Sequence, residues 1–129
     1  RERTVIAMDT LELLLKTEIP NPPEKSVKLK RLSKLCGGDV VFRLRALSYS
    51  RVAEIEEMHK GDDMPVFILL AGCASPDLKN AELMEKYKAL TPEDLVKVLL
   101  LPGEIEDLSR EVERLSGYRA LTFDEVKKK

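Results

Sequence analysis

The fold class is set by TPEDLVKVLLLPGEI, residues 91–105. Thr91 is a typical helix N-cap, Pro92 suits the first helical position, and the carboxylates after it face the positive end of the helix dipole. Pro102 must end or bend that helix, because proline lacks the backbone N–H that a helix interior needs. Glu104 then begins a second helix, whose apolar residues recur at spacings of three and four. We therefore predict two helices that meet at a corner.

Helical signals continue on both sides of this corner. Upstream, Ser50 is a plausible N-cap for a stretch with helical spacing. The apolar run 65–74 predicts a short buried helix, and Asn80 is a plausible cap for another. Downstream, Gly117 is the residue type expected just after the last turn of the second corner helix. Most of the chain from Ser50 onward is therefore predicted to be helical.

The two ends of the chain also carry helical signals. Apolar residues between Val5 and Leu15 recur at helical spacing, and the prolines of 19–23 end that helix. Thr122–Glu125 has the spacing of a capping box, which predicts a short helix at the C-terminus.

One part of the chain departs from the helical pattern. Residues 26–34 and 40–47 alternate between apolar and charged side chains, and Gly37-Gly38-Asp39 between them suits a tight turn. Arg31-Leu32 breaks the alternation, which indicates a bulge or an early strand end. We predict an antiparallel hairpin with one apolar face and one basic face.

These signals together predict a predominantly helical α+β fold, with one β-hairpin and about six short helices. The length of 129 residues fits a single domain over 1–129. Its expected parts are an N-terminal helix and Pro-rich linker (1–24), a basic hairpin (25–49), a helical part (50–118) and a short basic C-terminal tail (119–129).

Composition excludes several classes of protein. A hydrophobic fraction of 43% is too high for a disordered chain, and the net charge of −1 creates no overall field toward nucleic acid or an anionic membrane. Charge is nevertheless uneven, with +7 over residues 25–51 and −6 over residues 52–94. The apolar run 64–74 is too short to span a bilayer, and Arg1–Thr4 lacks the apolar core of a signal peptide. We expect a cytoplasmic protein.

Candidates for chemistry are few. One histidine and two cysteines without a CxxC spacing nearly exclude a structural zinc site. A hydrolase would need His59 as its base with Ser48 or Ser50 and Asp62, but no GxSxG elbow surrounds either serine. Phosphate-loop motifs are absent as well. We expect no enzyme activity and no catalytic, cofactor-binding or metal-ligating residues.

The basic face of the predicted hairpin supports an alternative function. Lys28, Lys30, Arg43 and Arg45 would lie together, and a two-stranded ribbon of this kind can enter a DNA major groove. No aromatic residue interleaves with these charges to stack on bases, so a solvated sheet face explains them as well. A small DNA-binding or regulatory protein is therefore the alternative.

The apolar run Val98–Leu101 covers every side of its helix. Either neighbouring elements enclose the run, or some of its leucines are exposed and await a partner. Periodicity alone leaves both readings open.

Four strings in the second half of the chain resemble the XkdN-like phage tail assembly chaperones. They are SPDLKN (75–80), LTPEDLV (90–96), LLLPGEI (99–105) and LSGY (115–118). The resemblance covers residues 75–118 closely and extends more loosely upstream through VKLKRL (27–32).

The resemblance implies a non-enzymatic protein of a bacterial prophage or a myophage-like element. Such chaperones are thought to bind the tape measure protein, the long helical ruler of the tail, and to help tail-tube subunits assemble around it. They act in the host bacterial cytoplasm and leave before the virion is complete. No cofactor, nucleotide or metal belongs to the family, and we expect neither nucleic acid nor membrane as a partner.

Two partner-binding surfaces are expected on this basis. The first combines the apolar run with the corner that follows it, namely Leu95, Leu99, Leu100, Pro102, Gly103 and Ile105. The second is the basic hairpin, with Lys28, Lys30, Arg43 and Arg45, which suits an acidic partner or another copy of the protein.

Overall fold

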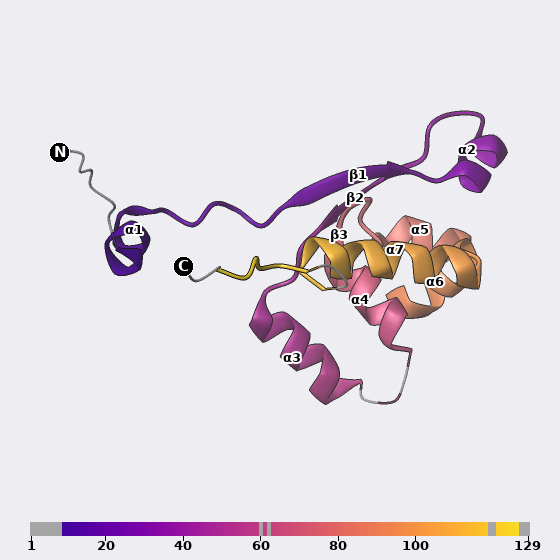
Figure 1. The fold of residues 1–129 in the computed structure, drawn as a ribbon. Coiled ribbons are helices and arrows are strands. Elements are labelled where there is room, and N and C mark those ends of the chain that lie inside the picture. The colour runs from indigo at the N-terminus through magenta and orange to yellow at the C-terminus, as the bar shows by residue number, and fades with distance from the viewer. Residues whose placement is uncertain (1–8, 60, 62, 119–120, 127–129) are drawn as a thin grey trace.

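The computed structural model describes residues 9–59, 61, 63–118 and 121–126. Within these ranges the chain forms seven helices and one three-stranded sheet, which confirms a predominantly helical α+β fold (Figure 1). The elements are α1 (Thr10–Lys16), β1 (Glu24–Lys28), α2 (Lys30–Cys36), β2 (Val41–Arg45), α3 (Tyr49–Met58), α4 (Met64–Gly72), β3 (Cys73–Ser75), α5 (Ala81–Lys86), α6 (Pro92–Leu99) and α7 (Pro102–Leu115).

The sheet is antiparallel, with β2 at its centre. β1 pairs with β2 from Glu24 opposite Arg45 to Lys28 opposite Val41, and β3 pairs with the other edge of β2. Along β2 the side chains alternate between buried and exposed, as the sequence pattern predicts. Phe42 therefore lies on the inner face, toward the helices.

The predicted hairpin is too long at both strands. Residues 30–34 were expected in a strand but form most of α2, and β2 ends at Arg45 rather than at residue 47. The ladder closes where the Leu29 N–H donates to the Val40 carbonyl oxygen at 2.9 Å, and the chain then turns into α2. Gly37, with φ of 72°, ends this helix instead of forming a two-residue turn. The break in alternation at Arg31-Leu32 thus marks an early strand end.

Two further boundaries differ from the predictions. Cys73 and Ala74 belong to β3 and not to the helix expected over 65–74, because β3 pairs with the free edge of β2, Cys73 with Leu44 and Ser75 with Arg43. Ser48, and not Ser50, caps α3, and α7 begins at Pro102 instead of Glu104.

The described residues cover part of each predicted terminal helix. The N-terminal helix is present as α1, while residues 1–8 lie outside the described part of the chain. Residues 121–126 carry neither helix nor strand, so the capping box expected at Thr122 is wrong. The rest of that predicted helix, residues 127–129, lies outside the described residues.

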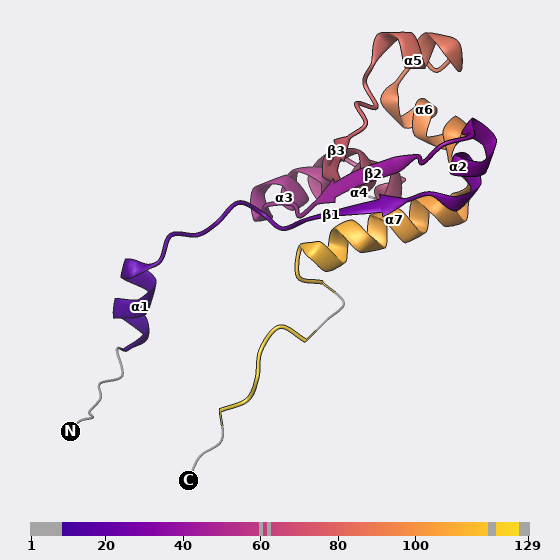
Figure 2. The same ribbon diagram turned by 90° about the horizontal axis from the view of Figure 1, so that it is seen from above.

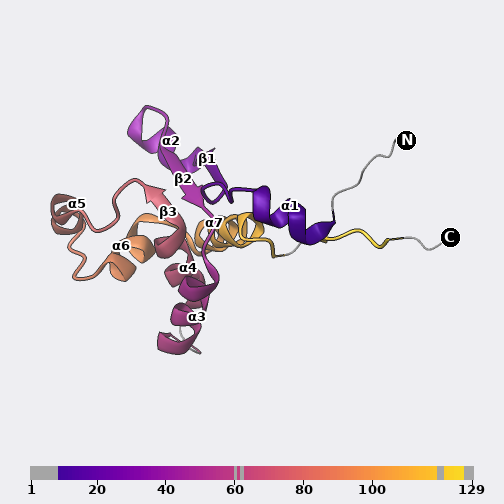
Figure 3. The ribbon, with the colours of Figure 1, turned by 90° about the vertical axis from the view of Figure 1, so that its left-hand side faces the viewer.

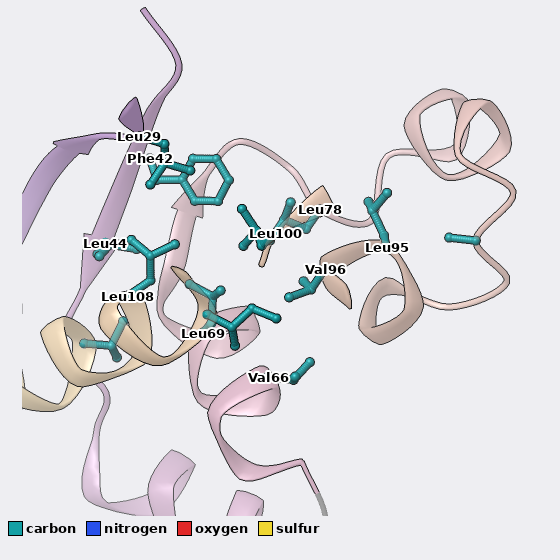
Figure 4. Close-up of a cluster of buried hydrophobic side chains, with 13 residues drawn as sticks. Leu29, Phe42, Leu44, Val66, Leu69, Leu78, Leu95, Val96, Leu100 and Leu108 are labelled. Carbon is teal, nitrogen blue, oxygen red and sulfur yellow. The ribbon is translucent and has the colours of Figure 1, made fainter. Parts of the chain in front are cut away.

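The core lies between the inner face of the sheet and the helices α4, α6 and α7 (Figure 4). α7 runs beneath β2, and α4 packs against α7 (Figure 1). The buried cluster consists of Leu29, Phe42, Leu44, Val66, Leu69, Leu78, Ala89, Leu95, Val96, Leu100, Ile105, Leu108 and Val112.

Two segments extend from this body. α1 stands apart from the other helices in all three views, and residues 121–126 leave the body on the same side as α1 (Figures 1, 2 and 3). α3 lies at that side as well in Figures 1 and 2, and it is attached to the body mainly through α4. Few core contacts therefore fix this side of the molecule.

Candidate functional site

The side chains considered for catalysis have structural contacts. The His59 imidazole stacks on Phe67, with ring centroids 3.5 Å apart and ring planes 6° apart. The Ser48 hydroxyl oxygen accepts a hydrogen bond from the Arg51 N–H at 3.1 Å and so caps α3. Ser50 is exposed in the first turn of that helix, and Asp62 lies outside the described residues. The ring stack explains the placement of His59 and the helix cap explains that of Ser48, so neither contact indicates a catalytic role.

The two cysteines lie in different environments. Burial raises the pKa of the Cys73 thiol to about 11, so the thiol is protonated at neutral pH. Its Sγ lies 3.3 Å from the carbonyl oxygen of Ser75, to which it donates. Cys36 is exposed at the end of α2. In the described part of the chain, no cluster of three or more His, Cys, Asp and Glu side chains could hold a metal ion.

Three of the leucine-rich candidates for partner binding lie in the core. Leu95, Leu100 and Ile105 are 0%, 3% and 7% exposed and belong to the buried cluster, in which Figure 4 labels Leu95 and Leu100. The expectation that they form an exposed apolar surface is wrong. Leu99 packs against the same cluster and is half-buried. Enclosure by neighbours, the first of the two open readings, therefore describes Leu100 and in part Leu99, whereas Val98 and Leu101 stay exposed.

The remaining candidates mark an exposed corner between α6 and α7. Pro102 and Gly103 are exposed there, as are the side chains of Val98 and Leu101. A shallow cavity of about 270 Å³ opens beside them, and we call it the corner pocket. It is lined by Asp63, Pro65, Val66, Lys97, Leu100, Pro102, Ile105 and Glu106. The Lys97 ammonium pairs with Asp63 across this pocket at 2.5 Å, and this hydrogen bond raises the pKa of Lys97.

An ion pair ties α2 to the corner. The Arg31 guanidinium donates to both carboxylate oxygens of Glu104, at 2.8 and 3.1 Å, and to the Leu99 carbonyl oxygen at 2.7 Å. Glu104 also accepts the Leu101 N–H at 2.8 Å at the start of α7. The hydrogen bonds from Arg31 hold the pKa of Glu104 below its usual value. Spacing in the sequence gave no sign of this pair, because its members are far apart in the chain.

The basic face exists but is largely paired. Lys28, Arg43 and Arg45 lie on the outer face of the sheet, as predicted from their alternation. Lys30 does not join them, because it lies in the first turn of α2. Lys28 pairs with Asp39 at 3.3 Å and Arg43 with Glu24 at 3.6 Å, so nearby carboxylates offset much of the positive charge.

The sequence analysis did not single out α1 as a binding surface. Its Leu11, Leu14 and Leu15 lie at spacings of three and one and so share one side of the helix. Their exposed fractions are 65%, 63% and 76%, and no residue of α1 is buried. The prolines of residues 20–23 could have indicated this surface, because they separate the helix from the rest of the chain and so from the core that would cover its leucines.

Two adjoining cavities lie along α3. A cavity of about 120 Å³ is lined by Leu47, Val52, Ile55, Glu56, Met64, Ile68, Glu113, Ser116 and Tyr118. A more open hollow of about 550 Å³ is lined by Ala53, Glu56, Glu57, Gly61 and Met64. The two adjoin at the residues they share, and together we call them the α3 groove.

The model of the phage XkdN-like tail assembly chaperone family matches residues 11–128. The chain belongs to this family. The residues of this tail assembly chaperone that match the family model include Leu11 to Lys16 of α1 and the residues that line the corner pocket and the α3 groove.

A solved structure shares the fold. The crystal structure of the protein YqbN aligns with a TM-score of 0.62 and 22% sequence identity, over 88% of this chain and 99% of that one. At this identity the likeness concerns the fold alone. A comparison of the tail assembly chaperone with curated proteins finds no match. Among its described residues, no helix is long and apolar enough to cross a membrane.

Proposed function

We propose that this tail assembly chaperone binds the tape measure protein and helps tail-tube subunits assemble around it. In this role the protein acts in the host bacterial cytoplasm and leaves before the virion is complete. Catalysis, cofactors and metals play no part in it. The proposal joins the family membership to the apolar side chains that the fold leaves exposed.

The observation that carries the proposal is the exposed leucine stripe of α1. Isolated helices shorter than about 12 residues are marginal in water, and α1 has seven residues. A capping box between Asp9 and Glu12 supports its first turn, but its apolar side has no cover in the core. Docking against an amphipathic helix would bury that side, and this is a common way for apolar helices to be recognised. A long helical ruler supplies such partners.

The corner pocket is a second proposed contact. Its exposed surroundings, Val98, Leu101, Pro102 and Gly103, keep part of the predicted leucine-rich surface, and Leu100 and Ile105 line the pocket itself. The outer face of the sheet, with Lys28, Arg43 and Arg45, is proposed for an acidic partner or for another copy of the chain. DNA binding is not proposed, because two of these three cations already have carboxylate partners.

Co-purification with the tape measure protein tests the role of α1. Leu15 on α1 and Leu35 on α2 are 76% and 71% exposed, so Leu15→Asp and Leu35→Asp introduce the same charge at equally exposed leucines. We expect Leu15→Asp to reduce the tape measure protein recovered by at least tenfold, and Leu35→Asp to leave recovery within twofold of the unmodified protein. Thermal melts of both variants check that the body stays folded.

Two results would contradict the proposal. If the unmodified chaperone recovers no tape measure protein from co-expressing cells, the proposed partner is wrong. If Leu15→Asp and Leu35→Asp reduce recovery equally, the partner stands but α1 is not its binding surface.

A further inference from the structure

We propose that the α3 groove binds an amphipathic helix whose polar side is basic. This inference rests on the proposed function, because it names the chemistry of a segment that the chaperone would hold. It concerns a surface separate from α1 and is tested without the tape measure protein.

The floor of the groove is apolar. Val52 and Ile55 come from one side of α3, and Met64 and Ile68 face them from α4. Engineered apolar cavities of about 150 Å³ hold a group of the size of benzene. The inner cavity, at about 120 Å³, is therefore of the right size for one aliphatic side chain of a partner.

The described charged side chains that line the groove have one sign. Among the described residues that line its two parts, every charged side chain is a glutamate, namely Glu56, Glu57 and Glu113. Opposite charges attract across a partly desolvated surface, and like charges there oppose association. A helix that inserts an apolar side chain and places lysine or arginine beside Glu56 and Glu57 fits both features.

The described segments of the chain leave the groove open. Residues 121–126 follow closely after Tyr118, which lines it, but Leu121 and Phe123 remain exposed. α1 is the other unburied apolar segment, and with its flanks it carries Asp9, Glu12 and Glu18 against Lys16. A net negative segment is disfavoured beside glutamates, so a basic segment of another protein is the fitting occupant.

Binding of designed peptides to the full chain tests this inference. The basic peptide is an 18-residue helix with a leucine stripe and lysines on its polar side. The acidic peptide carries glutamates in place of the lysines, and the scrambled peptide has the composition of the basic one without the stripe. We expect the basic peptide to bind at least tenfold more tightly than either of the others, and less tightly as salt is raised.

Charge reversal locates the site. The double variant Glu56→Lys/Glu57→Lys should bind the basic peptide at least tenfold more weakly and should gain affinity for the acidic peptide. The matched control, Glu82→Lys/Glu85→Lys, reverses two glutamates on α5, away from the groove, and should bind like the unmodified protein. Circular dichroism melts confirm that both double variants fold.

Three outcomes would overturn the inference. The first is equal binding of the basic and acidic peptides, and the second is unchanged binding of the basic peptide by Glu56→Lys/Glu57→Lys. The third is no binding of the basic peptide, which is the result expected if a second copy or the C-terminal segment of the chain occupies the groove. Sedimentation velocity identifies the second copy as a dimer. If the tape measure protein still co-purifies, each of these results contradicts only the inference about the α3 groove. If co-purification is lost but the basic peptide still binds, only the proposed function is contradicted.

Discussion

A Cβ atom on Gly72 would lie 2.5 Å from Cγ1 of Val112 and 2.6 Å from its Cγ2. Non-bonded carbon atoms do not approach so closely, so the last turn of α4 meets α7 at a distance that only glycine permits. Val112 is fully buried and belongs to the core that joins both helices to the sheet. The absence of one side chain therefore sets how closely the two central helices pack.

Gly72→Ala should destabilise the protein by about 1–3 kcal/mol, the usual cost of overpacking a filled core. Urea unfolding measures the loss. Gly103→Ala is the matched control, because a Cβ there meets no atom within 4 Å, and it should be neutral or slightly stabilising. The double variant Gly72→Ala/Val112→Ala should lose less stability than the sum of the two single losses, because Val112→Ala removes the methyl groups that the new Cβ at residue 72 would meet. If Gly72→Ala unfolds like the unmodified protein, the close approach is not real.

Leu100→Asp should unfold the chain and not merely disrupt binding. Leu100 is 3% exposed, and deleting a core leucine already removes about 2–5 kcal/mol before the charge is buried. Its neighbour Leu101 is 52% exposed, so Leu101→Asp should lower the melting temperature by only a few degrees. A cooperative melt of Leu100→Asp near that of the unmodified protein would contradict the burial of this side chain.

The ion pair between Arg31 and Glu104 should make stability depend on pH. The folded-state pKa of Glu104 is lowered by Arg31, so its contribution is present above the unfolded-state pKa of about 4.3 and is lost as pH falls through the folded value. Glu104→Gln should therefore be less stable than the unmodified protein at pH 7, and the difference should shrink in acid. Urea unfolding at pH 7 and pH 3 measures it, with Glu106→Gln as control. An unchanged difference would show that the charge of Glu104 is not involved.

Alkylation should distinguish the two cysteines. With a pKa of about 11, roughly one Cys73 thiol in a thousand is ionised at pH 8, and burial also limits access to its sulfur. Mass spectrometry after iodoacetamide treatment should find Cys36 modified first, and Cys73 modified at a comparable rate only in denaturant. Equal labelling in the native state would mean that the β3 edge is open to solvent.

Gel-shift titration should give no retarded DNA band at moderate salt. Lys28 and Arg43 are paired with Asp39 and Glu24, which leaves few cations on the sheet face to displace counterions from phosphates. Tight binding that weakens steeply between 50 and 200 mM salt, and that Arg43→Ala/Arg45→Ala abolishes, would instead support the DNA-binding alternative.

Local signals predicted the parts of the fold that local chemistry determines. Thr91 caps α6 and Asn80 caps α5, each through a side-chain oxygen that accepts a backbone N–H three residues on. Gly117 follows α7 with φ of 97°, and β2 alternates as expected. These features depend on a few consecutive residues, which is why a single sequence reveals them.

Features that depend on distant residues were not predictable in the same way. Nothing near Cys73 in the sequence shows that it meets Leu44 in a sheet, and an apolar run followed by Ser75-Pro76 looks like a helix up to the proline. The leucine run posed the same problem. Which of its members are buried depends on α4 and the sheet, so periodicity left the choice open and the expected binding surface fell partly in the core.

The proline-rich connection between α1 and β1 has one more consequence. If α1 and the α3 groove each hold a separate stretch of the same ruler, the connection makes the second contact intramolecular, and the pair gains avidity although neither contact is strong alone. Contacts of this kind also detach one at a time. If a growing tube displaces one contact, the remaining contact is no longer strengthened by the first and dissociates as a single weak contact. Strong binding during assembly is therefore compatible with rapid release afterwards.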